Sequence, residues 1–197
     1  GVNTYTGGTT VSGGTLQGDT TSLQGNILNN ATLIFDQAND GTYTGAISGP
    51  GSVTKQNVGT LIVKGVNTYT GGTLVSAGTL QGNTTSLPGN ILNNAAVVFD
   101  QEIDGTYAGI LSGTGSVTKQ NVGTLIVTGP NTYSGGTTVS AGTLQGNTTS
   151  LQGNILNNAS VIFDQTTNGT YSGILSGTGG LTKQNNSGVL TLKGAEK

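Results

Sequence analysis

The chain has 197 residues, of which 32% are hydrophobic and 7% are charged, so the sequence excludes a wide globular core. A formal net charge of −2 and the lack of arginine exclude a polyanion-binding surface, and without cysteine or histidine there are no disulfides, thiolate metal sites or nucleophilic triads. The 36 glycines punctuate short apolar runs, which indicates a folded chain with a narrow core.

Three near-identical copies of one 64-residue repeat make up the chain. Asn-Thr-Tyr recurs at Tyr5, Tyr69 and Tyr133, and Phe-Asp-Gln recurs at the same spacing. We therefore expect a single β-helix segment over residues 1–197, with repeats at 1–64, 65–128 and 129–193. The third copy has one extra residue within 185–188, which indicates a loop that accepts insertions. Because the chain begins inside a repeat, we expect it to be a fragment of a longer protein.

Short strands are predicted throughout, at 73–76, 78–81, 95–100, 105–112, 116–120 and 123–128 in the second copy. No window has a sustained helical period, and glycine at this density would weaken a helix by about 1 kcal/mol per residue. Each repeat divides into three coils of about 21 residues, which begin near Thr73, Ala95 and Ser116 in the second copy. The sequence thus predicts an all-β fold, a right-handed parallel β-helix (β-solenoid) of about nine coils.

The three copies also indicate which side chains face the interior. In residues 31–35 and their copies at 95–99 and 159–163, the first, third and fifth positions stay apolar, whereas the second position varies. Since strand side chains alternate between two faces, the constant set should point inward. The prediction is that Phe35, Phe99 and Phe163 are buried, and that Val75 faces the core.

Residues 51–81, with their Thr-Lys, Gly-Thr-Leu, Asn-Thr-Tyr and Gly-Gly-Thr motifs, resemble the passenger-associated transport repeat of autotransporters. The same run recurs at 115–145, and partial copies lie at 1–17 and 179–194. The resemblance implies a secreted parallel β-helix on the bacterial cell surface, contiguous in the parent protein with a C-terminal β-barrel translocator. It also implies that the repeats support export.

Catalysis has few candidates. Asp36 with Asp40, and Asp100 with Asp104, are the recurrent carboxylate pairs of the kind that glycosidases use, but the third copy has Asn168 in place of the second carboxylate. The glycine-rich nonapeptide of calcium-loaded β-rolls is absent. We expect these aspartates to cap turns or lie on the surface, and we expect no enzymatic activity, metal or cofactor.

Two other recurrent polar groups have a structural and a binding interpretation. Asn29-Asn30 and its copies should form turns, because asparagine tolerates positive φ, although its amide could also recognise carbohydrate. Tyr5, Tyr69 and Tyr133 should cover the edge of a coil, although they could stack on a sugar or a peptide.

The copies differ most at 38–40, 102–104 and 166–168, which we expect to be protruding loops. The candidate interaction residues are Asn39, Asp40, Glu102, Ile103, Asp104, Thr167 and Asn168. The leading hypothesis is a structural stalk that extends from the cell; the alternatives are an adhesin module that binds a host-cell or matrix surface through these loops, and a self-assembling filament subunit. No nucleic-acid partner and no membrane insertion are expected.

Overall fold

The computed structural model describes residues 1–194, in which every regular element is a β-strand. No helix in this part of the chain is long and apolar enough to span a membrane. The chain divides into two compact units, Gly1–Val97 and Val98–Lys197.

The strands are short and follow one another closely. Those of the first unit are β1 (Thr9–Val11), β2 (Thr15–Gly18), β3 (Ile27–Asn29), β4 (Thr32–Asp36), β5 (Gly41–Tyr43), β6 (Ile47–Ser48), β7 (Ser52–Gln56), β8 (Thr60–Val63), β9 (Thr73–Val75), β10 (Thr79–Gly82) and β11 (Ile91–Asn93). β12 (Ala96–Asp100) runs across the division. Those of the second unit are β13 (Gly105–Tyr107), β14 (Leu111–Ser112), β15 (Ser116–Gln120), β16 (Thr124–Val127), β17 (Thr137–Val139), β18 (Thr143–Gly146), β19 (Ile155–Asn157), β20 (Ser160–Asp164), β21 (Gly169–Tyr171), β22 (Leu175–Ser176), β23 (Gly180–Gln184) and β24 (Leu190–Leu192).

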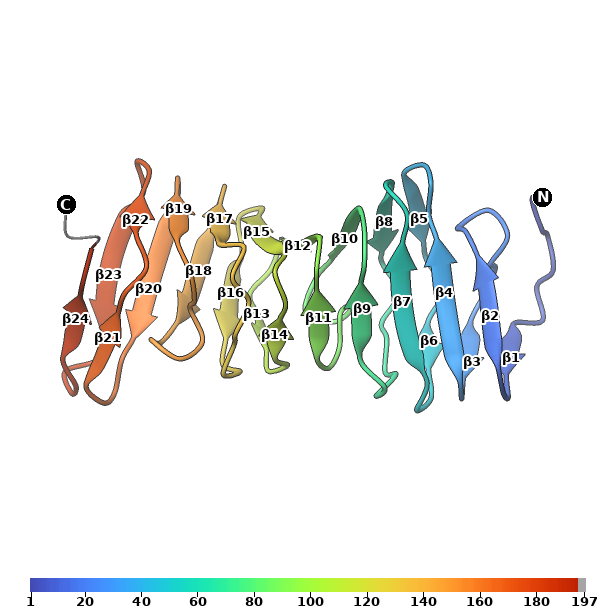
Figure 1. Cartoon of the computed structure of the whole chain (residues 1–197), viewed down its shortest axis with the longest axis horizontal. Helices are drawn as coiled ribbons and strands as arrows, with labels where there is room; N and C mark the ends of the chain where they lie inside the picture. Colours follow the sequence, from blue (N-terminus) through green and yellow to red (C-terminus); the bar gives the residue numbers. More distant parts are fainter. Residues whose placement is uncertain (195–197) are drawn as a thin grey trace. The chain divides into compact units, whose positions relative to one another are not determined.

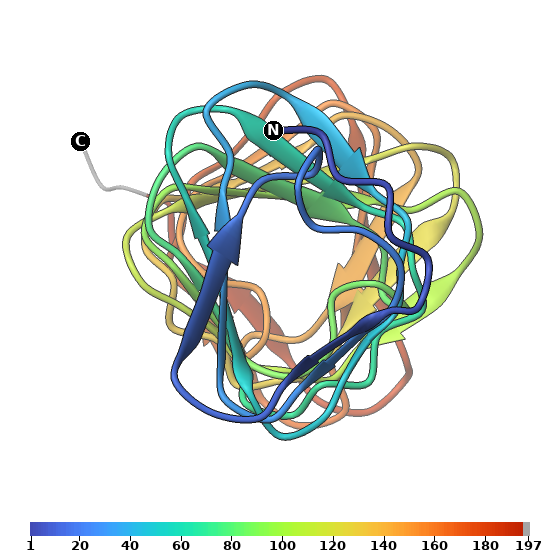
Figure 2. The same ribbon diagram turned by 90° about the vertical axis from the view of Figure 1, so that its right-hand side faces the viewer.

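Within each unit the strands pair in parallel and wind round a common interior (Figures 1 and 2). The first unit has ladders in the order β1-β3-β6, β2-β4-β7-β9-β11 and β5-β8-β10. The second has the ladders β15-β17-β19-β22, β13-β16-β18-β20-β23 and β21-β24. The predicted all-β parallel β-helix of about nine turns is confirmed.

The coils are shorter than the sequence predicted. Thr15 pairs with Thr32, and Ile27 pairs with Ile47, so the chain returns to the same ladder sooner than expected. One repeat therefore makes slightly more than three turns. The prediction of three whole coils per repeat was wrong because residues 67–70 occupy a ladder position without forming a strand: the amide of Thr68 donates to the carbonyl of Ile47 at 2.9 Å.

The sequence repeat is consequently not a whole number of turns long. β9 is the copy of β1 in the next repeat, and each pairs with the copy of the same strand, but β1 belongs to the ladder β1-β3-β6 and β9 to the ladder that begins at β2. In the second unit, β15 and its copy β23 likewise belong to different ladders. Equivalent side chains of successive repeats thus leave the coil from different faces.

The interior is filled by the alternate apolar side chains that the sequence indicated. Phe35 and Phe163 are fully buried, as is Phe99, and Val75 faces the core. The ring of Phe35 packs edge-on against Tyr43 with centroids 5.1 Å apart, which adds an aromatic contact to the area buried. The predicted facing of these strands is confirmed.

Candidate functional site

The variable loop of the first repeat lies between β4 and β5, where Asn39 and Asp40 are exposed. The buried side chain of Gln37 supports it, because its Nε2 donates to the carbonyl of Asn39 at 2.7 Å. The turn of the next coil stacks directly on this loop: a Cβ on Gly59 would lie 2.5 Å from the carbonyl carbon of Asn39. The loop backbone is therefore fixed, and only its tip is open to a partner.

Asp40 caps β8, a strand of the next coil. Its Oδ1 accepts a hydrogen bond of 2.7 Å from the amide of Thr60, and this bond lowers the pKa of the carboxyl. Asp104 makes the same bond to Thr124. Asn168 replaces the carboxylate with an amide oxygen, which accepts from the amide of Val189 at 2.9 Å. Since an amide serves as well as a carboxylate, the position needs an acceptor rather than a charge.

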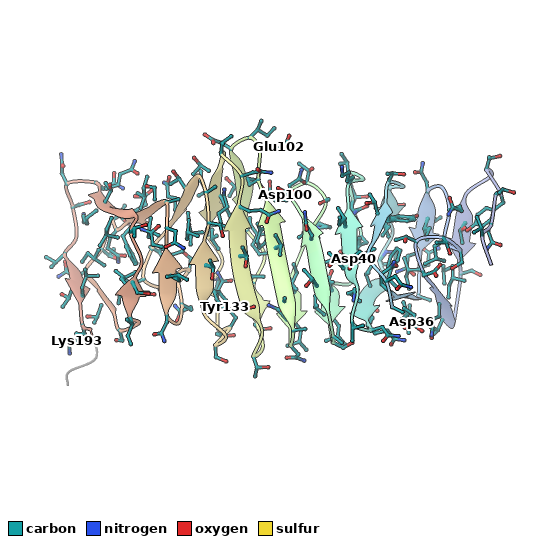
Figure 3. The ribbon with its side chains drawn as sticks, turned by 90° about the horizontal axis from the view of Figure 1, so that it is seen from above. Asp36, Asp40, Asp100, Glu102, Tyr133 and Lys193 are labelled. Carbon is teal, nitrogen blue, oxygen red and sulfur yellow. The ribbon has the colours of Figure 1, made fainter. Side chains whose placement is uncertain are left out.

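The loop of the second repeat keeps the same backbone contact with the next turn but has different side chains at its tip. Glu102 projects away from the coils in Figure 3, and Ile103 is 76% exposed. The adjacent turn places Gly123 against the backbone of Ile103 and carries Val122, which is 81% exposed. Two exposed large apolar side chains on neighbouring turns leave this corner open to an apolar partner.

The third loop, with Thr167 and Asn168, is also exposed, but it does not join the second in one surface. Residues 102–104 lead into β13, whereas residues 166–168 follow β20, and β13 and β20 belong to the same ladder. The two loops therefore emerge at different corners of the coil. Within the second unit, the two variable loops therefore do not form one site.

Lysines at the core were not foreseen. Lys55 is fully buried, and its ammonium donates to the carbonyls of Gln56, Asn57 and Ala77 at 3.1, 2.6 and 3.0 Å. Burial lowers the pKa of this lysine, while the carboxylates of Asp36 and Asp40 oppose the change. The sequence signal was the alternation itself, since Lys55 follows the inward-facing Val53 by two positions in the strand.

The same arrangement recurs in the second unit. Lys119 is fully buried and donates to the carbonyls of Gln120, Asn121 and Ala141. Asn121 has a φ of +66°, in the left-handed region that asparagine tolerates better than most residues. The lysine thus holds a sharp turn together and connects it to the coil that contains Ala141.

Buried asparagines join successive coils. Asn67 is 5% exposed; its Oδ1 accepts from the amide of Ile47 at 2.7 Å, and its Nδ2 donates to the carbonyl of Ser86 at 2.7 Å. Asn29 is also buried and caps its turn by accepting from the amide of Ala31, whereas Asn30 is exposed. The Asn-Asn pair therefore supports its turn through the side chain of Asn29, whereas the positive φ expected there is found at Asn57, Asn121 and Asn185 instead.

The tyrosines of the Asn-Thr-Tyr segments divide into two groups. Tyr69 and Tyr133 are each 4% exposed, and the hydroxyl of Tyr69 lies 2.6 Å from that of Thr73. Tyr5 is 40% exposed. Stacking of Tyr69 or Tyr133 on a sugar or peptide is thus excluded by burial.

The carboxylates that the sequence offered as pairs include Asp36, whose hydrogen bonds reach neighbouring coils. Asp36 accepts from Nε2 of Gln17 at 2.9 Å and from Nδ2 of Asn57 at 2.9 Å, which ties neighbouring coils together. Asp164 is held in the same way by Asn185. Within residues 1–194 no group of three or more His, Cys, Asp or Glu side chains could hold a metal ion.

A groove of about 350 Å³ in the second unit is lined by Thr148, Leu151, Gln152, Gly153, Asn154, Thr170, Tyr171, Ser172 and Gly173. Its polar groups are largely engaged with one another: the Tyr171 hydroxyl donates to the Gly153 carbonyl, and Nε2 of Gln152 donates to the Thr148 carbonyl. No charged side chain lines it, so it offers no strong anchor for an ionic ligand.

Comparison with known proteins gave two findings. The passenger-associated-transport-repeat family matches residues 1–17, 53–81 and 117–145. The adhesin BmaC autotransporter of Brucella suis biovar 1 (strain 1330) is 38% identical over 188 residues, a match that covers 73% of this chain and 5% of the relative. The chain thus spans a small part of that relative's length. No solved structure matches the chain.

Proposed function

We infer that the chain belongs with the autotransporter passengers that carry passenger-associated transport repeats, and on that premise we propose that it is a non-catalytic stalk segment of a cell-surface adhesin. One observation carries the proposal: recurrent polar side chains of the repeat are used to join coils. Lys55 bonds to Ala77 in the next coil, and Asn67 bonds to Ile47 and Ser86 on either side. Because the same side chains join coil to coil in each repeat, a stalk of this kind can be lengthened by the addition of repeats.

The location follows from the same premise. Autotransporter passengers are exported across the outer membrane, so the segment would lie on the bacterial surface, joined in the parent protein to a C-terminal translocator. The lack of cysteine suits a chain that is exported unfolded, because no disulfide forms on the way.

A second candidate function is adhesion by the variable loops to a host-cell or matrix surface. It is favoured by the exposed tips Ile103 and Val122, since exposed apolar side chains on neighbouring turns often mark contact sites. The relative is an adhesin, which supports an adhesive role for the parent protein. The different chemistry of the three tips favours the stalk for the segment itself.

A loop exchange in the surface-displayed parent protein separates the two candidates. The variant Asn39→Ser, Glu102→Ser, Ile103→Ser, Thr167→Ser changes the tips and retains Asp40, Asp104 and Asn168 as caps. We expect binding of displaying cells to host cells and to matrix-coated surfaces to equal that of the parent at equal surface level. Loss of binding with an unchanged circular dichroism spectrum of the segment would assign adhesion to the loops.

A further inference from the structure

The motif Asn-X-Ser/Thr, in which asparagine accepts an N-linked sugar, lies at one corner of two repeats. It is Asn30-Ala31-Thr32 in the first repeat and Asn158-Ala159-Ser160 in the third. The second repeat has Asn94-Ala95-Ala96 there, which retains the asparagine but lacks the hydroxyl. The motif is short, so its value depends on whether the structure leaves the amide and the hydroxyl accessible.

The side-chain amide of Asn30 is accessible. Asn30 is exposed, its backbone amide donates to the carbonyl of Val11 at 2.9 Å, and its Nδ2 donates no hydrogen bond within residues 1–194. The next coil passes this corner with Gly49, which has a φ of +98°, and a Cβ on Gly49 would lie 3.1 Å from Oδ1 of Asn30. Glycine at this position therefore leaves the amide uncovered.

The hydroxyl of the motif lies on the outer face of β4. Thr32 is half-buried and precedes the inward-facing Leu33, so its side chain points outward. Its neighbours on this face are Thr15 in the coil before and Ser52 in the coil after. Both side chains are small, which leaves room for a sugar beside the strand.

The third repeat presents the same groups. Asn158 is exposed, and Ser160 lies on the outer face of β20 between Thr143 and Gly180. Asn94, in the middle of the chain, is exposed as well. The open corner is therefore a property of the repeat.

At four other asparagines the motif is engaged in the fold: Asn83, Asn147, Asn168 and Asn185. Oδ1 of Asn83 accepts from both the amide and the hydroxyl of Thr85, at 3.0 and 2.8 Å, and Asn147 makes the same turn. Asn168 is the cap described above, and Nδ2 of Asn185 donates to Asp164. Within residues 1–194, a transferase that acts on the folded chain would therefore find the amide and the hydroxyl accessible together at Asn30 and Asn158.

We propose that Asn30 and Asn158 carry N-linked sugar, added by a transferase from a donor in which C1 of the sugar is bonded to a diphosphate. Nδ2 of the asparagine forms a bond to C1 as the bond between C1 and the diphosphate oxygen breaks. The diphosphate leaves with the electron pair, and one Nδ2 proton passes to a base of the transferase. The proposal holds whether the segment is a spacer or an adhesive module.

Three variants that copy one repeat into another test the role of the motif. Thr32→Ala and Ser160→Ala reproduce the second repeat, so each should remove one sugar while the asparagine remains. Ala96→Thr reproduces the first repeat and should add a sugar at Asn94. Each new side chain already occurs at the equivalent position of another repeat, so the melting temperature should change little.

Mass spectrometry of peptides from the parent protein and its variants, isolated from the bacterium that makes it, gives the result. We expect sugar on Asn30 and Asn158 and none on Asn83 or Asn147. A single hexose would identify a nucleotide-activated donor, and a preassembled oligosaccharide would identify a lipid-linked donor; either supports the proposal. Unmodified Asn30 or Asn158, sugar on Asn83 or Asn147, or sugar on Asn30 that persists in Thr32→Ala would overturn it.

Discussion

The ammonium of Lys55 donates a hydrogen bond of 3.0 Å to the carbonyl of Ala77, which lies in the next coil. A fully buried lysine is costly unless every proton has an acceptor, and here three backbone carbonyls provide them. The interior of the solenoid is therefore narrow and apolar along its strands but polar at this turn, where the coils are joined.

Replacing Lys119 with methionine should destabilise the second unit by about 3 kcal/mol, because three buried carbonyls lose their donor. Lys64 is exposed, so Lys64→Met is the matched control and should change the free energy of unfolding by less than about 0.5 kcal/mol. Denaturant melts of both variants give the comparison. Equal effects would show that the ammonium does not hold the turn.

Phe99→Ala should destabilise by about 3 to 5 kcal/mol, since the truncation leaves a void in a narrow core where Phe99 packs against Tyr107. Ile103→Ala, at an exposed loop, should be nearly neutral. Urea melts monitored by circular dichroism measure both. A loss below about 1 kcal/mol for Phe99→Ala would contradict the packing of this coil.

Lowering the pH should remove the contribution that the Asp19 carboxylate makes to the stability of the fold. Hydrogen bonds from the side chains and amides of Thr21 and Ser22 lower the pKa of Asp19 from 3.8 to about 2. A carboxyl with a lowered pKa stabilises the fold above its unfolded value, and this stabilisation is lost as the pH falls from about 4 to about 2.

The control for this pH dependence is present in the sequence, because Asn83 and Asn147 make the same turn with an amide oxygen. Asp19→Asn should therefore fold and should lose less stability than the parent between those pH values. Melting temperatures of the two proteins as a function of pH test this. Parallel curves would mean that the Asp19 carboxylate has no preferred interaction in the folded chain.

The loop caps allow a similar exchange. Asp104→Asn should leave the melting temperature unchanged, since Asn168 caps the equivalent strand with an amide oxygen. Asp104→Ala should lower it, because the amide of Thr124 loses its acceptor. If Ala and Asn had the same effect, the hydrogen bond would contribute nothing to stability.

Much of this architecture could be predicted from the sequence, because alternation along a strand directly reports burial. Val97 and Phe99 stay apolar in every copy and are fully buried, and the varying loops are exposed. The burial of Lys55 was not predicted, although this residue follows the alternation two positions after the inward-facing Val53. One of its acceptors is the carbonyl of Ala77 in the next coil, which no local pattern reveals.

The predicted length of one turn was too long for a related reason. Residues 67–70 lack the apolar alternation of a strand, yet they fill a ladder position through Asn67 and the buried Tyr69. The amides of Thr68 and Thr70 donate to the carbonyls of Ile47 and Gly49, and the side chain of Asn67 adds a bond to Ile47, so the segment is held without a regular strand. A count of strands alone therefore underestimates the number of ladder positions in a repeat.

Deletion of residues 65–128 should leave a folded segment. The deletion joins equivalent positions, so β7 would receive β17 in the register in which it now receives β9. The β-sheet circular dichroism signal per residue should be unchanged, and the m-value should fall with the smaller buried surface. A deletion of half a repeat is the control and should not fold, because it joins strands of different facing.

The same deletion tests the stalk function most directly. In the surface-displayed parent protein, removal of residues 65–128 takes away one loop with Glu102 and Ile103 and one whole repeat, while the rest of the passenger is unchanged. Binding of displaying cells to host cells and matrix, measured at equal surface level, should match that of the undeleted protein if the repeat is a spacer. A loss of binding with normal surface level would show that the repeat itself carries the adhesive site.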